Sequence, residues 1–413
     1  MRKLISLIII AVAALSLFTA MARVKTGIDV LCENGFQQLQ GKRVGLITNP
    51  TGVNSELKST VDLLAEAPGV TLAALYAPEH GVRGNVTAGG KVSTYTDPQT
   101  GVKVWSIYGG TTKPTRQMLQ GIDVLVYDIQ DIGSRSYTFI STMGKCMEAA
   151  AENNIPFMVL DRPNPLGGVK VEGGLVDSDC ISFVSQYPIP YIYGLTCGEL
   201  AGYLNGEGLL RHGVKCDLTV IPMEGWRRDM RWEDTGLFWV LTSPHVPQPV
   251  SATFYPASGI LGELNYMNIG VGYNLPFQLF CASWVNASQL ADKLNSMNIK
   301  GFLFRPIHIR PYYGIGEGRD LQGVQPYITD YDSCELTLLQ FHVMEALAVL
   351  YPAHKPFVGA TASRLGMFDK VCGSKSIRRD FTASGYKVSA IYDAWMRPAK
   401  AFREKSSRYY LYQ

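Results

Sequence analysis

Five short apolar runs, each followed by a polar cluster rich in Gly and Pro, constrain the fold of this 413-residue chain more than any other feature. The runs lie at residues 44–47, 71–76, 102–108, 124–127 and 157–160. Helical patterns separate several of them, most clearly at residues 137–154, where apolar side chains recur at helical spacing. This alternation predicts an α/β fold with a mostly parallel sheet covered on both faces.

The pattern changes after residue 181, and a second unit of α+β type is expected from about residue 241. A helix near residue 288, strands at 301–309 and 325–330, and a helix at 335–350 follow one another there. We expect Asp332 or Ser333 to cap the last helix, and residues 226–256 to be irregular. The predicted division is therefore a domain at 23–240 and a smaller domain at 241–413.

The first 22 residues have the pattern of a signal peptide. Arg2 and Lys3 precede an apolar run at residues 4–18, and Ala-Met-Ala at 20–22 provides a cleavage site. The run is shorter than the ~18–20 residues that span a bilayer. We expect an exported protein that begins near Arg23 and does not stay in the membrane; an uncleaved anchor helix is the alternative.

Composition excludes several classes of function. With 46% hydrophobic residues, 18% charged residues and a net charge of +3, the chain can build a core but offers no basic surface for nucleic acid. The six histidines form no HExxH pair, and there is no GxSxG motif. The glycines at residues 35–41 lack the spacing of a phosphate-binding loop. No metal or cofactor is predicted, and eight cysteines without a CxxC predict no disulfide framework.

The polar clusters after the first, second, fourth and fifth runs are the candidates for a functional site. In open α/β sheets the carboxyl ends of the strands share one edge, and ligands bind there. Four clusters far apart in the sequence would therefore converge. The alternative is that Asn, Asp, Pro and Gly only form turns at these places.

Glu79 is the leading catalytic candidate, because it follows an apolar strand and a Pro and precedes His80. A carboxyl group partly shielded from water suits a general acid near neutral pH. Asp128, Asp131 or Asp161 could supply a second carboxylate, and paired carboxylates fit glycoside hydrolysis. We predict Glu79, His80 and Asp128 as catalytic residues. The predicted substrate-binding residues are Asn49, Arg83, Gln130, Asp131, Arg135, Asp161, Arg162, Asn164 and Tyr193. For Asp161 and Arg162, a turn cap or a mutual ion pair is the alternative.

Several long motifs also carry a resemblance to a known family. They are GLITNPTG (45–52), APEHGVRG (77–84), DIQDIGSRSYTF (128–139), LDRPNPLGG (160–168) and YGLTCGEL (193–200). They are similar to an exported bacterial family long known only as a domain of unknown function and now associated with exo-β-N-acetylmuramidases of the NamZ type.

The resemblance implies a Rossmann-like domain that carries the site and a smaller domain that helps to close it. It implies a periplasmic enzyme that releases N-acetylmuramic acid from the non-reducing end of peptidoglycan fragments, with Glu79 of the PEHG motif as the catalytic residue. The lactyl group of that sugar is a carboxylate, which gives Arg83, Arg135 and Arg162 a role in binding it.

One segment departs from the family pattern. Many members carry Ser-Glu-Gly-Arg-Gly shortly before Pro-Phe, whereas this chain has Asn-Ile-Gly-Val-Gly at 268–272. Ile269 and Val271 replace the acid and the arginine, and Glu263 could compensate for the acid. Two functions therefore stay open: an exo-acting glycosidase, and a non-catalytic periplasmic protein that binds a related glycan in the same cleft.

Overall fold

The computed structural model describes residues 23–84, 90 and 93–413 of the chain. The predicted signal peptide, residues 1–22, lies outside this range. Within it, no helix combines the length and the apolar character that crossing a bilayer requires. All eight cysteines are free thiols, seven of them buried, so none constrains the fold covalently.

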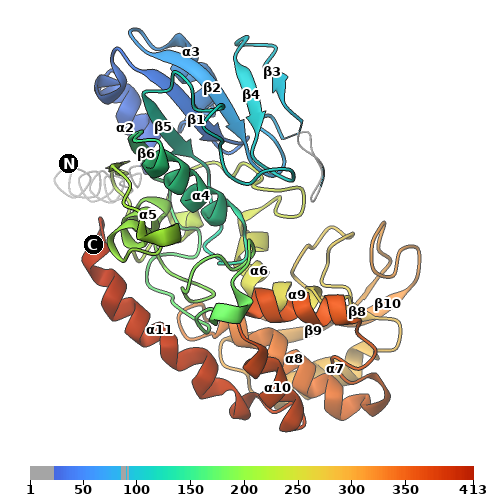
Figure 1. Ribbon diagram of the computed structural model, residues 1–413. Helices are drawn as coiled ribbons and strands as arrows, with labels where there is room; N and C mark the ends of the chain where they lie inside the picture. Colours follow the sequence, from blue (N-terminus) through green and yellow to red (C-terminus); the bar gives the residue numbers. More distant parts are fainter. Residues whose placement is uncertain (1–22, 85–89, 91–92) are drawn as a thin grey trace, which may run out of the picture.

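A seven-stranded sheet forms the centre of the amino-terminal half, residues 23–248 (Figure 1). Its strands are β1 (Arg43–Thr48), β2 (Thr71–Ala77), β3 (Tyr95–Thr96), β4 (Lys103–Ser106), β5 (Val124–Asp128), β6 (Phe157–Leu160) and β7 (Leu218–Ile221). They are ordered β3-β4-β2-β1-β5-β6-β7, and every neighbouring pair is parallel except β3 with β4. Without β3 this is the order of a doubly wound sheet, whose switch point lies between β1 and β5. The predicted Rossmann-like α/β fold is confirmed.

Helices cover both faces of this sheet. They are α2 (Gly27–Glu33), α3 (Thr60–Glu66), α4 (Phe139–Glu152) and α5 (Cys197–Gly206). Side chains of α4 and α5 form one apolar cluster with the sheet, and those of α2 and α3 form another. Because β5 and β6 are buried along their whole length, residues 124–127 of β5 and 157–160 of β6 form continuous apolar runs instead of alternating.

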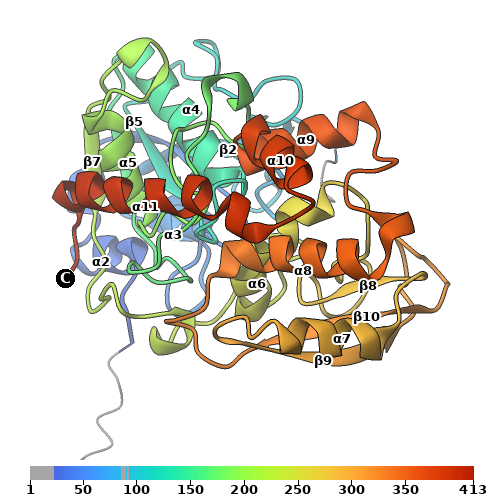
Figure 2. The ribbon, with the colours of Figure 1, turned by 90° about the horizontal axis from the view of Figure 1, so that it is seen from below.

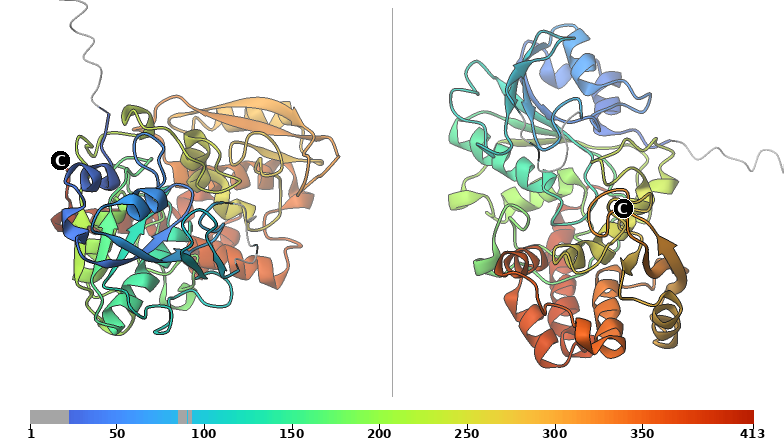
Figure 3. Two further views of the ribbon diagram at one scale, coloured as in Figure 1. Left: turned by 90° about the horizontal axis from the view of Figure 1, so that it is seen from above. Right: turned by 90° about the vertical axis from the view of Figure 1, so that its right-hand side faces the viewer.

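The carboxyl-terminal half, residues 249–413, is the smaller α+β unit. It contains α6 (Pro249–Gly262), β8 (Phe280–Ala282), α7 (Ala287–Ser296), β9 (Phe302–Ile309), β10 (Leu321–Ile328), α8 (Leu336–Leu350), α9 (Ala362–Cys372), α10 (Lys375–Ala383) and α11 (Tyr392–Ser406). The three strands form an antiparallel sheet in the order β8-β10-β9. Figure 3 shows the two sheets in separate halves of the molecule.

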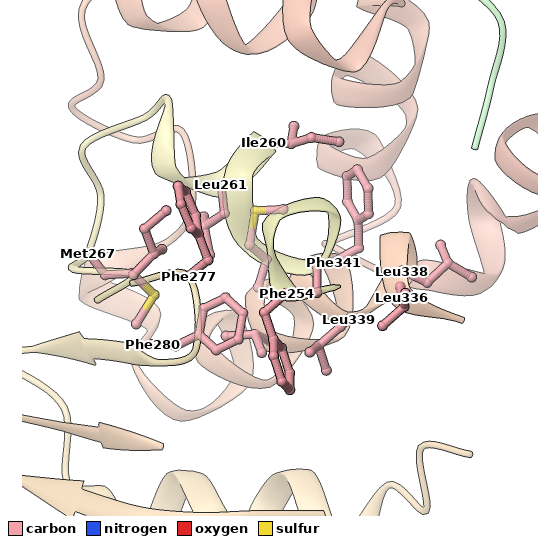
Figure 4. Packing of buried hydrophobic residues seen from close by; sticks show 14 of the residues in the cluster. Phe254, Ile260, Leu261, Met267, Phe277, Phe280, Leu336, Leu338, Leu339 and Phe341 are labelled. Atoms are coloured by element: carbon pink, nitrogen blue, oxygen red, sulfur yellow. The ribbon is translucent and has the colours of Figure 1, made fainter. Parts of the chain in front are cut away.

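Two helices, α6 and α8, build the core of this half. Phe254 and Ile260 of α6 lie with Leu339 and Phe341 of α8 in one buried cluster, to which Phe280 of β8 contributes (Figure 4). The sequence predicted an irregular segment at residues 226–256, and this was wrong from residue 249 onward, where α6 begins. Proline begins α6 at its first position, where no backbone N–H is needed, and a second proline lies within the helix. The start of α8 also differs from the prediction, since its N-cap is Glu335.

The structure also contains short 3₁₀ turns. They lie at Gln37–Leu39, Ser178–Cys180, Arg211–Gly213, Trp232–Asp234, Pro352–His354, Val388–Ala390 and Ser407–Tyr409. Helix α11 runs back along the amino-terminal half beside α5 (Figures 1 and 2). There Phe402 packs edge-on against Tyr203 with ring centroids 5.1 Å apart, and the Tyr412 hydroxyl donates to Asp161 over 2.6 Å. The last helix thus crosses the predicted division at residues 240/241, which stays a prediction.

Candidate active site

A cavity of about 550 Å³ lies between the two halves. From the amino-terminal half, the cavity is lined by residues that follow β2 and β4 and by residues 136–139 at the start of α4. From the other half come α6, the loop after it, and α9. Ligand pockets for small molecules fall in this size range and often lie where two structural units meet.

Glu79 lies in this cavity, in the turn that follows β2. The turn is closed by a hydrogen bond from the Gly81 N–H to the Pro78 carbonyl (3.1 Å). The Tyr108 hydroxyl donates to one carboxylate oxygen of Glu79 (2.8 Å), and the Thr138 hydroxyl donates to the other (3.1 Å). Both hydroxyls can also accept a hydrogen bond, so the same geometry holds the protonated and the ionised carboxyl group.

His80 occupies the third position of that turn with a φ of +71°, which is unusual for a residue other than glycine. Such a conformation costs of order 1–3 kcal/mol and is kept where the surroundings enforce it, often at functional sites. A second imidazole, His245, lies near it in the cavity wall. Burial lowers the pKa of His245, and the nearby His80 lowers it further.

Glu263 provides the second carboxyl group among the described residues that line the cavity. It follows α6, and burial raises its pKa while the nearby Arg364 acts in the opposite direction. Ile269 and Val271, the two positions that depart from the family pattern, belong to the same wall.

Asp128 and Arg162 are held inside the sheet edge instead. The Asp128 carboxylate is fully buried and accepts from the Arg162 guanidinium (2.9 Å) and from the Thr60 hydroxyl. Arg162 also donates to the Val53 carbonyl (2.7 Å). The prediction of Asp128 as a catalytic residue beside Glu79 is therefore not met. Its carboxylate does not line the cavity, because it is paired inside the protein with the Arg162 guanidinium.

Asp131 and Asp161 are also buried and internally bonded. Asp131 accepts from the Tyr193 hydroxyl and from the Gly133 N–H (2.8 Å). Asp161 accepts from the Thr196 hydroxyl (2.7 Å) and from the Gly198 N–H (2.8 Å), besides Tyr412. Burial raises the pKa of each carboxyl group to about 6. Both were predicted to bind substrate, but neither lines the cavity, because their carboxyl oxygens bond inside the protein.

The other predicted arginines have internal partners. Arg83 bonds with Asp97 (3.0 and 3.1 Å) and Asp62 (3.2 Å), which fastens the loop after β2 to α3 and to the β3 strand region. Arg135 is fully buried, and its guanidinium donates to main-chain carbonyls of both halves. Its acceptors are Gly174 (2.6 Å), Ile189 (2.7 Å), Val371 (3.2 Å) and Cys372 (2.8 Å). The last two end α9.

The predicted amide side chains hold loops together. The Asn49 side-chain oxygen accepts from the Thr51 N–H (2.9 Å), and Gln130 donates to the Pro163 carbonyl (2.7 Å). Asn164 donates to the Leu195 carbonyl (2.9 Å). Of the site residues predicted from the sequence, Glu79 and His80 are the ones that line the cavity in the part of the chain that the structure describes.

No group of three or more His, Cys, Asp or Glu side chains is arranged to hold a metal ion among the described residues.

Comparison with known proteins agrees with the resemblance seen in the motifs. One family model, "Exo-beta-N-acetylmuramidase NamZ, N-terminal", matches residues 44–250, and its C-terminal counterpart matches residues 253–412. The chain belongs to the NamZ family.

A Bacillus subtilis (strain 168) member of the NamZ family, peptidoglycan beta-N-acetylmuramidase NamZ, is 43% identical over 390 residues, which cover 94% of this chain and 92% of that protein. Two DUF1343 family proteins of Bacteroides fragilis NCTC 9343 have similar crystal structures. The first is 55% identical with a TM-score of 0.91, and the second is 26% identical with a TM-score of 0.72. Each match covers 95% of this chain and 99% of the other.

Two NamZ-type motifs of this chain thus reach the cavity, PEHG through Glu79 and His80, and SYTF through residues 136–139. The cavity residues that sequence reasoning missed include Tyr108, His245, Tyr255 and Arg364. They stand in no recognisable motif, and three of them belong to segments that were expected to be irregular or were not assigned an element. Tyr255 and Arg364 reach the cavity only because the two halves pack together, whereas Tyr108 and His245 belong to the same half as Glu79.

Proposed function

We propose that this protein is an exo-acting glycoside hydrolase that releases N-acetylmuramic acid, or a related amino sugar, from the non-reducing end of peptidoglycan fragments. The observation that carries the proposal is the position of Glu79, a carboxyl group held by two hydroxyls in a cavity between the halves of a NamZ-family chain.

Glu79 acts in this proposal as the general acid that protonates the glycosidic oxygen. Tyr108 and Thr138 fix both oxygens of the carboxyl group, so that the proton is presented in one direction. Positioned proton transfer of this kind contributes typically ~10²–10⁴-fold in rate. The aromatic residues Tyr137, Tyr255 and Phe277 surround the sugar with apolar surface.

The non-catalytic alternative is a protein that binds the glycan without cleaving it. Ile269 and Val271 favour it, because they replace two charged residues of the family pattern in the cavity wall. In that case the cavity keeps its affinity for the sugar and the protein shows no turnover.

The test uses the wild-type protein with the disaccharides MurNAc-GlcNAc and GlcNAc-MurNAc. We expect release of N-acetylmuramic acid from the first and no cleavage of the second, as an exo-acting muramidase requires. Binding of N-acetylmuramic acid by calorimetry without turnover of either disaccharide would support the binding protein, and neither binding nor turnover would exclude both.

We also propose that the protein is exported to the periplasm and that residues 1–22 are removed. The support is the basic, apolar and small-residue pattern of that segment. Mass spectrometry of the protein isolated from its host should give Arg23 as the first residue, and an intact Met1 would favour the anchor helix.

A further inference from the structure

The cavity carries one guanidinium among its described lining residues, that of Arg364 on α9. Besides three tyrosine hydroxyls, its other titratable groups there are the acids Glu79 and Glu263 and the imidazoles His80 and His245. Arg83, Arg135 and Arg162 have their hydrogen bonds inside the protein, as described above. An anionic substituent of a bound sugar therefore meets a permanent positive charge at Arg364.

Contacts with the loop after α6 hold the Arg364 side chain in place. One terminal nitrogen donates to the Glu263 carbonyl (3.5 Å). With the Asn265 amide oriented to satisfy its surroundings, its oxygen accepts from the other terminal nitrogen (2.7 Å) and from Nε (3.2 Å). These bonds use three of the five guanidinium N–H groups and leave one on each terminal nitrogen. A planar fork with two remaining donors matches a carboxylate.

The surroundings of Arg364 leave its charge available. The acid of the cavity that interacts with Arg364 is Glu263, and burial raises the pKa of this carboxyl group more than Arg364 lowers it, so it carries less negative charge than an exposed glutamate at the same pH. Ile269 and Val271 add neither an acid nor a base to the same wall.

Helix α9 is also fixed relative to Glu79. Arg135 donates to the Val371 and Cys372 carbonyls at the end of α9 and precedes residues 136–139, which line the cavity next to Glu79. The position of Arg364 is thus coupled to the half that carries the proposed acid.

We propose that Arg364 binds the carboxylate of the substrate's lactyl group and so determines the preference for muramic acid over sugars without this group. The inference rests on the proposed function and adds a specificity-determining residue to it. Arg364 lies in a segment without a family motif, which is why sequence reasoning assigned this task to other arginines.

The experiment compares a chromogenic β-N-acetylmuramide with its lactyl methyl ester, which has nearly the same shape and no charge. A charge-assisted pair is expected to favour the acid by about 10- to 100-fold in kcat/KM in the wild type. Arg364→Gln should remove this preference by raising KM for the acid, while kcat/KM for the ester changes by less than about threefold. Arg364→Lys, which keeps the charge and loses the fork, should lie between the two.

Arg379→Gln is the matched control, because it removes the same charge from an exposed site on α10, where Arg379 pairs with Asp380. It should leave the preference unchanged. A wild type without preference, or a folded Arg364→Gln variant that keeps the wild-type preference, would overturn the proposal. Folding is checked by the urea midpoint, and the Lys variant provides the comparison if the Gln variant is unstable.

The proposed function can fail independently of this inference. If the wild type cleaves neither substrate, calorimetry with N-acetylmuramic acid and its methyl ester tests Arg364 in the same way. Tighter binding of the acid by the wild type, lost in Arg364→Gln, would then support the assignment, and equal affinities of the two proteins for the acid would refute it.

Discussion

Replacing Arg135 by Met tests whether this residue joins the two halves or binds substrate. Its guanidinium donates to four main-chain carbonyls and to the Ser185 hydroxyl (3.3 Å), and it lies 5.4 Å from the centre of the Tyr191 ring. Two of those carbonyls end α9, where a cation also interacts favourably with the helix dipole. Met is unbranched, apolar and close to Arg in volume, so Arg135→Met removes the donors with little change in volume.

The expected loss of stability follows from two opposing contributions. Four buried carbonyls lose a charged donor, and at about 1.5 kcal/mol each this costs about 6 kcal/mol. Burial lowers the pKa of Arg135 from 12.5 to about 10, so the charged form is disfavoured by about 3 kcal/mol in the folded protein. Replacing Arg135 by an apolar residue removes this unfavourable contribution and so stabilises the variant by the same amount. The net decrease in the free energy of unfolding is therefore about 3 kcal/mol.

The assay is urea unfolding followed by circular dichroism, together with calorimetry of N-acetylmuramic acid binding to the folded variant. Arg379→Met serves as control and should change the stability by less than about 1 kcal/mol, because exposed ion pairs contribute little. An Arg135→Met variant that unfolds at the wild-type midpoint and no longer binds the sugar would refute this reasoning. It would show that Arg135 binds substrate, as the sequence predicted.

Three further predictions concern other buried groups. Asp128→Asn leaves the buried Arg162 without its countercharge, so we expect a loss of about 3–5 kcal/mol in urea unfolding with kcat/KM nearly unchanged; normal stability with lost turnover would contradict this. Because burial raises the pKa of Asp161 from 3.8 to about 6, its contribution to stability is full below about pH 4 and falls as the pH rises through 6, by about 1 kcal/mol between pH 5 and 7.5. Asp161→Asn should abolish this part of the pH dependence in urea unfolding, and an unchanged dependence would count against it. Ile269→Glu adds a carboxyl group to a buried position in the cavity wall, so we expect about tenfold weaker binding of N-acetylmuramic acid by calorimetry, restored by adding Val271→Arg; unaltered affinity in the single variant would show that this segment does not contact the sugar.

The sequence predicted the parallel sheet because strands buried on both faces are continuously apolar and end in turns, and these signals are local. Helix α6 was missed because its prolines indicate a loop, whereas one begins the helix and the other is tolerated by packing against α8. That packing depends on residues about 80 positions further along the chain, such as Leu339 and Phe341.

The candidate site was predictable only in part, for a physical reason. Polar residues at the ends of parallel strands do converge, as Asp128 and Arg162 show, but the sequence does not tell whether they face a ligand or each other. A buried ion pair and an open site require the same residue types at the same places. Glu79 differs because its turn points toward the carboxyl-terminal half, and the residues across from it, such as Glu263 and Arg364, come close only when the halves pack.

The most direct test of the central claim, that Glu79 is the proton donor, is kcat/KM of Glu79→Gln on two substrates with different leaving groups. In MurNAc-GlcNAc the leaving group is a sugar hydroxyl, whose oxygen needs a proton as it departs. A nitrophenyl β-N-acetylmuramide instead releases nitrophenolate, a stable anion. With Glu404→Gln as an exposed control, we expect a loss of ~10²–10⁴-fold on the disaccharide and a much smaller loss on the nitrophenyl substrate, with normal folding and product binding. Equal losses on both substrates, or turnover of the disaccharide within about threefold of the wild type, would contradict the assignment.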